Sequence, residues 1–212
     1  MDEYQKFIHK SRYARYLDSE GRRETWEETV DRYCRFWENT ISHKGKKLPL
    51  PDEVRQAILD MEIMPSMRAL MTAGPALERD HMAGYNCSFI AVDHVRAFDE
   101  NLYVLLCGTG VGFSVERQFI SKLPDVGEAF HDTDSTIVVR DSKIGWASAL
   151  RELISFLYHG LIPKIDYSRI RPSGARLKTF GGRASGPDPL KRLFMQYIRI
   201  FQNAKGRKLT SI

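Results

Sequence analysis

The sequence has no run of about 18 apolar residues, the length at which a segment becomes a candidate membrane helix. The chain begins with charged residues, Asp2, Glu3 and Lys6, and no apolar signal segment follows them. Nothing in the sequence therefore directs the chain into or across a membrane, and we expect a cytoplasmic protein.

Cysteine is scarce, because the 212 residues include only Cys34, Cys87 and Cys107. An odd number without a CxxC motif or a Cys/His ligand spacing argues against the disulfide framework of a small secreted protein and against a structural zinc site. We therefore expect no metal site. Cys34 lies on the apolar stripe of a predicted helix, which favours a small buried hydrophobic residue.

Two common nucleotide-binding motifs are also absent. The chain has no GxxxxGK[ST] phosphate loop. Its segment Gly108–Val115 has the spacing GxGxG after a predicted helix, whereas a dinucleotide fingerprint needs GxGxxG after a strand and at the start of a helix. This excludes a Rossmann site and leaves open a tight turn at which the backbone approaches a ligand.

The composition is that of an ordinary globular protein, with 42% hydrophobic and 28% charged residues. The net charge of +5 is unevenly distributed along the chain. Residues 164–212 contain 12 Lys and Arg against 2 Asp and Glu, whereas residues 1–163 contain 20 against 25. The basic end predicts an anionic partner, either nucleic acid or a phosphorylated small molecule.

Residues 171–189 form the most unusual stretch, which we call the basic loop. It contains four glycines, three prolines, three arginines and one lysine between two helical patterns. Glycine reaches φ values that other residues avoid, and arginine binds anions. A flexible linker is the alternative, but linkers are usually poor in hydrophobic residues, and this stretch contains Leu177 and Phe180. We therefore predict a shaped anion-binding loop.

Apolar residues at helical spacing predict several helices. We expect residues 1–60 to form a helical unit, and the last two predicted helices to form, with the basic loop, a subdomain inserted after a strand at Gly112. Residues 65–75 contain too many Pro and Gly for one regular element. The predicted helices are Thr25–Ile41, a helix from near Pro51 with Val54, Ile58 and Met61 on one side, Phe98–Cys107 with Leu102, Leu105 and Leu106 inward, Ser142–Leu157, and a helix from its N-cap Asp188 to Gly206.

The segment Gly84–Val92 is rich in β-forming residues and predicts a short strand with Cys87 near its beginning. A thiol at a strand end can be redox-active or nucleophilic. The local sequence alone nevertheless favours a packed core cysteine.

Six blocks of sequence occur in one order along the chain: Ser11–Tyr16, Pro65–Leu70, Tyr85–Cys87, Gly108–Arg117, Gly174–Gly186 and Gly206–Ser211. Together they resemble the adenosylcobalamin-dependent ribonucleoside-triphosphate reductases, the monomeric class II ribonucleotide reductases. Ordered blocks are far more specific than a single motif. They span nearly the whole chain but correspond only to the N-terminal third or so of such an enzyme.

The resemblance implies an α/β fold with a helical N-terminal region, the first part of a ten-stranded α/β barrel and an inserted helical subdomain that binds a deoxynucleotide effector. We accordingly assign residues 1–80 to the N-terminal helical region. Residues 81–120 would supply the first barrel strands, with the redox cysteine and the glycine turn. Residues 121–212 would form the effector-binding subdomain and the return toward the barrel.

In such enzymes a cobalamin-derived radical generates a thiyl radical that removes the ribose 3′ hydrogen, and two further cysteines supply reducing equivalents as the 2′ hydroxyl leaves. Cys87 matches the first of this reducing pair, which reverses the interpretation from its local sequence. Its thiol would form a disulfide that a thioredoxin-like partner reduces again. The predicted wall around the ribonucleoside triphosphate substrate comprises Ser66, Asn86, Gly108, Gly110 and Gly112.

The resemblance also places a deoxynucleoside triphosphate effector near the basic loop, where charged side chains suit a ribose and phosphates. Cys107 matches no functional position, so we expect it to serve in packing. The predicted effector-binding residues are Asp141, Lys143, Arg176, Lys178 and Arg183.

The chain ends before the regions in which the family keeps its thiyl cysteine, its catalytic glutamate, its second redox cysteine and most of its adenosylcobalamin contacts. We therefore expect one piece of a split or truncated reductase, inactive without a C-terminal fragment. One alternative is a non-catalytic, nucleotide-binding regulatory module. Another is DNA or RNA binding by residues 164–212, which lack a recognition-helix, zinc-finger or interleaved-aromatic pattern.

Overall fold

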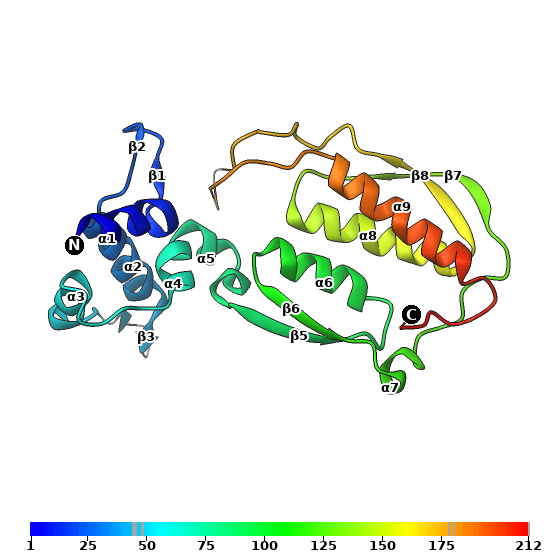
Figure 1. The fold of residues 1–212 in the computed structure, drawn as a ribbon, viewed down its shortest axis with the longest axis horizontal. Helices are drawn as coiled ribbons and strands as arrows, with labels where there is room; N and C mark the ends of the chain where they lie inside the picture. Colours follow the sequence, from blue (N-terminus) through cyan, green and yellow to red (C-terminus); the bar gives the residue numbers. More distant parts are fainter. Residues whose placement is uncertain (44–45, 48, 178, 180, 212) are drawn as a thin grey trace. The chain divides into compact units, whose positions relative to one another are not determined.

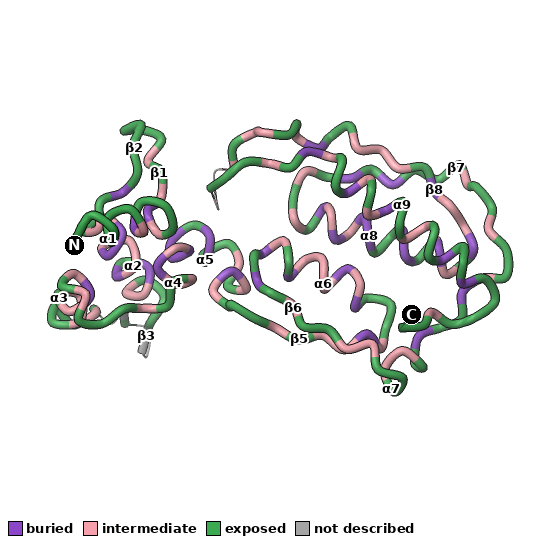
Figure 2. The backbone as a smooth tube through the Cα atoms, viewed as in Figure 1, coloured by how far each residue is buried: buried purple, intermediate pink, exposed green. Residues whose placement is uncertain are grey.

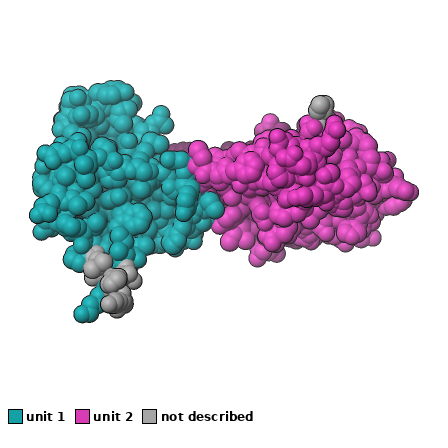
Figure 3. All heavy atoms as spheres, turned by 90° about the horizontal axis from the view of Figure 1, so that it is seen from below, with its two compact units in different colours: residues 1–86, 178–181 teal, residues 87–177, 182–212 magenta. Residues whose placement is uncertain are grey.

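A computed structural model describes residues 1–43, 46–47, 49–177, 179 and 181–211 (Figure 1). The chain has a mixed α/β fold, as predicted, and divides into two compact units, coloured separately in Figure 3. Unit 1 comprises Met1–Asn86 and Lys178–Gly181, and unit 2 comprises Cys87–Leu177 and Gly182–Ile212. Among the described residues, no helix is long and apolar enough to cross a membrane.

Unit 1 is mainly helical, which confirms the prediction for residues 1–60. Two short antiparallel pairs connect its first helices: β1 (Tyr16–Leu17) with β2 (Arg22–Arg23), and β3 (Ser42–His43) with β4 (Lys46–Lys47). Its helical elements are α1 (Glu3–Ile8), a π-helical turn (His9–Tyr13), α2 (Trp26–Thr40), α3 (Asp52–Leu59), α4 (Met67–Thr72), α5 (Pro75–Arg79) and a 3-10 turn (His81–Gly84).

Helix α2 begins where the sequence supplies a cap. Thr25 Oγ1 accepts a hydrogen bond from the Glu28 backbone at 3.2 Å, and the Glu28 carboxylate accepts one from the Thr25 backbone at 2.7 Å. This reciprocal capping satisfies two backbone donors at the helix start. Val30, Cys34 and Phe36 are buried on the inner face, so the predicted packing role of Cys34 is confirmed.

One local prediction in unit 1 was wrong. Met61 follows α3 with a φ of 60°, outside the helix, because the chain turns after Asp60. Residues 65–75 do not form one regular element, as expected: α4, which Ser66 caps by accepting a hydrogen bond from the Ala69 backbone at 3.4 Å, ends at Thr72, and α5 begins at Pro75 after a turn at Gly74.

Unit 2 contains two parallel βαβ arrangements (Figure 1). In the first, β5 (Cys87–Ala91) and β6 (Gly110–Ser114) are joined by α6 (Ala97–Leu106). In the second, β7 (His131–Val138) and β8 (Leu161–Asp166) are joined by α8 (Lys143–Tyr158), with a register shift between Asp132 and Thr136. The short α7 (Arg117–Ile120) follows β6, and α9 (Asp188–Asn203) follows the basic loop.

The predicted helices of unit 2 are confirmed, with small differences at their ends. Helix α9 has Pro187 as its N-cap, one residue before the predicted Asp188, and it ends at Asn203. Leu105 is 52% exposed rather than inward, because the neighbouring Val104 takes the buried position on α6. Strands β7 and β8 were not predicted, since β7 is largely polar and β8 contains Pro163, a residue that argues against a strand.

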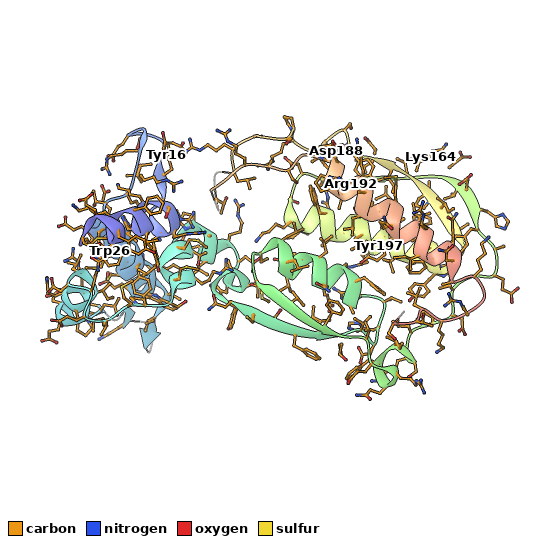
Figure 4. The ribbon with its side chains drawn as sticks, viewed as in Figure 1. Tyr16, Trp26, Lys164, Asp188, Arg192 and Tyr197 are labelled. Atoms are coloured by element: carbon orange, nitrogen blue, oxygen red, sulfur yellow. The ribbon has the colours of Figure 1, made fainter. Side chains whose placement is uncertain are left out.

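The largest core lies around α8 and α9, whose inner faces are buried (Figure 2). Leu150, Leu153 and Phe194 are fully buried there. Tyr197 of α9, which is labelled in Figure 4, meets Phe98 of α6 edge to face, with ring centroids 6.0 Å apart. The core of unit 2 therefore joins the two βαβ arrangements through their helices.

An ion pair between a buried aspartate and a half-exposed arginine also joins α6 to α8. The Asp99 carboxylate is 2% exposed and accepts hydrogen bonds from Arg151 Nε at 3.0 Å and Nη2 at 2.7 Å. These bonds compensate for the cost of removing the carboxylate from water.

Candidate functional site

Cys87 is the first residue of β5, and its side chain is exposed, whereas Cys34 and Cys107 are buried. Its partner in the parallel ladder is Gly110, and the next position on the same face pairs Phe89 with Gly112. Paired residues of neighbouring strands project to the same side of a sheet. The surface beside the thiol is therefore open, because glycine places no side chain there.

The predicted glycine turn is shorter than expected. Gly108 has a φ of +84° and follows Cys107, the C-cap of α6, so it forms the turn. Gly110 and Gly112 belong to strand β6 instead. Their pairing with β5 draws them into the sheet, where a Cβ on Gly112 would lie 3.7 Å from the Ser88 carbonyl oxygen, an ordinary contact.

Two predicted substrate residues belong to unit 1. Ser66 caps α4, and Asn86 is exposed and immediately precedes Cys87 in the chain. Gly108, Gly110 and Gly112 belong to unit 2, so the substrate wall stays a prediction.

The predicted effector residues Asp141 and Lys143 flank Ser142, the N-cap of α8. Ser142 Oγ accepts a hydrogen bond from the Gly145 backbone at 2.9 Å. Asp141 Oδ2 lies 2.7 Å from Arg171 Nε, which joins the start of the basic loop to the start of α8. Arg171 was not among the predicted effector residues. Its position as the first residue of the basic loop could have identified it as a candidate.

Lys143 is turned toward α6. Its Nζ donates to Cys107 Sγ at 3.2 Å and lies 5.9 Å from the centre of the Tyr103 ring. Cys107 is fully buried, in agreement with the expected packing role. The lysine contact could not be found from sequence, because 36 residues separate the two side chains.

The basic loop is a hydrogen-bonded hairpin. The Gly174 backbone donates to the Ala184 carbonyl at 2.9 Å, and the Leu177 backbone donates to the Gly182 carbonyl at 3.0 Å. These bonds contradict the alternative of a flexible linker. All four glycines of the loop have positive φ, as the composition suggested: Gly174, Gly181, Gly182 and Gly186.

The two arginines predicted to bind the effector face each other across this hairpin. Arg176 and Arg183 form an isolated antiparallel bridge, and both are exposed. Arg183 Nη1 also donates to the Gly174 carbonyl at 3.0 Å, which fixes part of its guanidinium within the loop. Lys178 and Phe180 lie outside the described residues.

Unit 2 also has an open groove of about 690 Å³ beside the strand pair β5–β6. The lining includes no His or Cys that could ligate the cobalt of a cobalamin. Among the described residues, no group of three His, Cys, Asp or Glu side chains is placed to hold a metal ion. The groove is lined by Phe89, Phe113, Ser114, Val115, Glu116, Phe119 and Ser211.

Comparison with known families finds one match within unit 2. Residues 117–201 match the family described as the insertion domain of B12-dependent ribonucleotide reductase. This segment contains β7, α8, β8 and the basic loop, and nearly all of α9.

Known reductases are similar over nearly the whole chain. The adenosylcobalamin-dependent ribonucleoside-triphosphate reductase of Euglena gracilis is 29% identical over 222 residues, covering 93% of this chain and 30% of the relative. That of Lactobacillus leichmannii is 27% identical over 272 residues, covering 96% of this chain and 36% of the relative. The chain thus spans about a third of these relatives.

A solved structure has the same fold. The crystal structure of a B-12 dependent (class II) ribonucleotide reductase superposes with a TM-score of 0.80 at 27% identity, covering 96% of this chain and 38% of that chain. These similarities confirm the resemblance inferred from the six sequence blocks.

Proposed function

We propose that this chain is the N-terminal part of an adenosylcobalamin-dependent ribonucleoside-triphosphate reductase, which supplies one redox cysteine, part of the substrate wall and the effector site. The carrying observation is the exposed Cys87 thiol beside two strand glycines, in a chain similar to such reductases over more than nine-tenths of its length. The proposal includes the first strands of a ten-stranded barrel, to which β5 and β6 would belong.

Cys87 would act as one of two reducing thiols. When the ribose 2′ hydroxyl leaves as water, the two thiols lose their hydrogens and form a disulfide, so the substrate gains the two electrons that the cysteines lose. A thioredoxin-like dithiol would then reduce this disulfide by thiol exchange. Exposure of Cys87 supports this role, because both exchange steps require direct access to its sulfur.

The substrate wall would use small groups. Gly110 and Gly112 let a ribonucleotide approach the β5–β6 strand pair closely, because neither carries a side chain. Ser66, Asn86 and Gly108 would add hydroxyl, amide and backbone contacts to the ribose and phosphates. None of these groups is a base that would compete for the substrate protons.

The effector would bind between the start of α8 and the basic loop. The first turn of a long helix presents free backbone N–H groups that favour an anion, and α8 has 16 residues. Asp141 suits a ribose hydroxyl, while Lys143, Arg176, Lys178 and Arg183 suit phosphates. The ion pair from Asp141 to Arg171 supports this placement, since it brings the loop to the helix start.

Adenosylcobalamin would supply the radical that begins the reaction. We assign most of its contacts to the part of the reductase beyond the aligned third. The ribonucleoside triphosphate, the deoxynucleoside triphosphate effector, a C-terminal reductase fragment and a thioredoxin-like reductant are the proposed partners.

Complementation tests this function. The purified 212-residue chain, given adenosylcobalamin and a dithiol, should not reduce ribonucleoside triphosphates, whereas addition of a polypeptide supplying the remaining reductase sequence should produce turnover. Cys87→Ser should abolish multiple turnover with thioredoxin, and Cys34→Ser and Cys107→Ser should retain it as matched controls. Normal turnover by Cys87→Ser would refute the redox assignment. If the chain binds nucleotides but the added polypeptide never restores turnover, the regulatory module is favoured instead.

A further inference from the structure

The tip of the basic loop is held within unit 1. Thr179 belongs to that unit. Thr179 is bound twice: its carbonyl oxygen accepts a hydrogen bond from Arg15 Nη1, and its Oγ1 accepts one from Arg79 Nη1 at 3.2 Å. Two arginines from distant parts of the sequence therefore meet at one residue of the loop.

Arg15 is fixed by further contacts. Its Nε donates to the Met71 carbonyl at 3.1 Å, and its backbone N–H donates to Glu24 Oε2 at 3.0 Å. Burial lowers the pKa of the Arg15 guanidinium, and the charge of Arg32 acts in the same direction, but a guanidinium remains protonated in proteins. Because its donors form a rigid planar fork, the contact with Met71 also sets the direction in which Nη1 points.

Glu24 stabilises this arrangement by accepting several hydrogen bonds. Its carboxylate is 4% exposed and accepts hydrogen bonds from Arg32 Nε at 2.8 Å and Nη2 at 3.0 Å, and from Thr29 Oγ1 at 3.0 Å. Burial acts to raise the pKa of Glu24, but the bonds from Arg32 and from the Arg15 backbone outweigh it, so the pKa lies below its ordinary value. The carboxylate is thus charged, and both of its oxygens are bonded.

We propose that Arg15 and Arg79 are positioning residues that hold the tip of the basic loop through Thr179. A loop with four glycines has many accessible conformations, and restricting it to one of them costs conformational entropy. Holding the tip before a ligand arrives removes part of that cost from binding. We call the hydrogen bonds from Arg15 and Arg79 to Thr179 the latch. The consequence of the latch for nucleotide binding rests on the proposed effector function, whereas its existence does not.

Hydrogen exchange on the 212-residue chain without nucleotide tests the latch. The amides of Gly174, Leu177 and Ala184 are hydrogen-bonded within the loop and should exchange about tenfold faster or more in Arg15→Met. Arg12→Met removes the same charge from an exposed position three residues away and is the matched control. Equal loop exchange in Arg15→Met and wild type, with α2 amides still protected, would overturn the proposal.

A second pair of variants decides the outcome if Arg15→Met also loosens α2. Arg79→Met and Thr179→Val each remove the hydrogen bond between these two side chains while leaving the Glu24 network intact. Each should accelerate loop exchange, and the double variant should match the single variants because both remove one bond. Additive effects, or no effect in either variant, would contradict the proposed contact.

Calorimetric titration then separates the latch from the effector function. Each of dATP, dGTP, dCTP and dTTP would be titrated into wild type, Arg15→Met and Arg12→Met. We expect about tenfold weaker binding for Arg15→Met and unchanged binding for Arg12→Met. If wild type binds none of the four nucleotides, the effector function fails, while the exchange result still decides the latch. Equal affinity in all three proteins would overturn the link between the latch and binding.

Discussion

The three cysteines occupy three different environments, which makes them distinguishable by reagent. Cys87 is exposed, Cys34 is 4% exposed and Cys107 is fully buried. A soluble thiol reagent should therefore modify Cys87 first in the native chain, and the other two cysteines only after unfolding. Mass spectrometry of digested, time-resolved samples measures this order. Rapid native labelling of Cys107 would contradict the described packing of α6.

His9 should make unit 1 sensitive to pH. Its Nε2 lies 2.9 Å from Thr29 Oγ1, and its ring meets Trp26 edge to face. Burial lowers the pKa of His9 below 6.5, and Lys10 and Arg32 add to this effect, while Glu24 opposes it. The unfolded chain therefore takes up a proton that the folded chain resists, so the free energy of unfolding falls as pH drops below about 6.5 and levels off below the folded-state pKa.

Replacement of His9 tests this sign. His9→Gln keeps a polar side chain but cannot be protonated, so the pH dependence of its unfolding should be flatter between about pH 5 and 8. Chemical denaturation followed by tryptophan fluorescence measures the difference, since Trp26 and Trp37 belong to unit 1. Glu24 contributes mainly at lower pH, because its ordinary pKa of 4.5 in the unfolded chain and its lower pKa in the folded chain both lie below this window. Equal slopes in both proteins would contradict the role of His9.

At the scale of elements, the basic loop is the feature on which nucleotide binding should depend. Removal of Arg176 or Arg183 should weaken binding of deoxynucleoside triphosphates about ten- to a hundredfold, because each charge-assisted hydrogen bond contributes roughly 1.5 to 3 kcal/mol. Calorimetric titration of Arg176→Ala and Arg183→Ala in the complemented enzyme measures the loss. Substrate choice in mixed-nucleotide assays should change in parallel. Unchanged affinity in both variants would reduce the loop to a structural connection between α8 and α9.

The turn between α8 and β8 should tolerate no side chain. Gly160 has a φ of +70°, and a Cβ there would lie 2.1 Å from the Ala129 carbonyl oxygen. Gly160→Ala should therefore destabilise unit 2 by more than the roughly 1 to 2 kcal/mol of left-handed backbone strain alone. Gly182→Ala is the matched control, because its φ is +84° and nothing lies within 4 Å of an added Cβ. Equal losses of stability in denaturant titrations would contradict the close contact.

At the scale of the whole molecule, the two units have separate hydrophobic cores. Ile58 belongs to a cluster with Val30 and Cys34 in unit 1, and Leu153 belongs to the large cluster of unit 2. We expect two unfolding transitions in calorimetry. Ile58→Ala should lower the free energy of unfolding of unit 1, and Leu153→Ala that of unit 2, each by about 2 to 5 kcal/mol. Each variant should therefore lower the temperature of only one transition. A single transition that both variants shift equally would show that the units unfold together.

The sequence by itself determined the features that depend on neighbouring residues. The helices follow from apolar spacing and from caps such as Thr25 and Ser142, whose partners lie within one turn. The strand at Cys87 and the positive φ angles of the loop glycines were also local consequences of composition. The resemblance to the reductases rests on the six ordered blocks, which can be identified in the sequence without knowledge of any contact.

Only the tertiary structure decided which distant residues meet. The pairing of β7 with β8 depends on strands separated by α8, and neither strand has an apolar alternation that would reveal it. The contact of Lys143 with Cys107 and the two bonds to Thr179 join side chains far apart in sequence. Such contacts depend on the packing of whole elements, and local periodicity contains no information about a partner that the chain reaches only after it has folded.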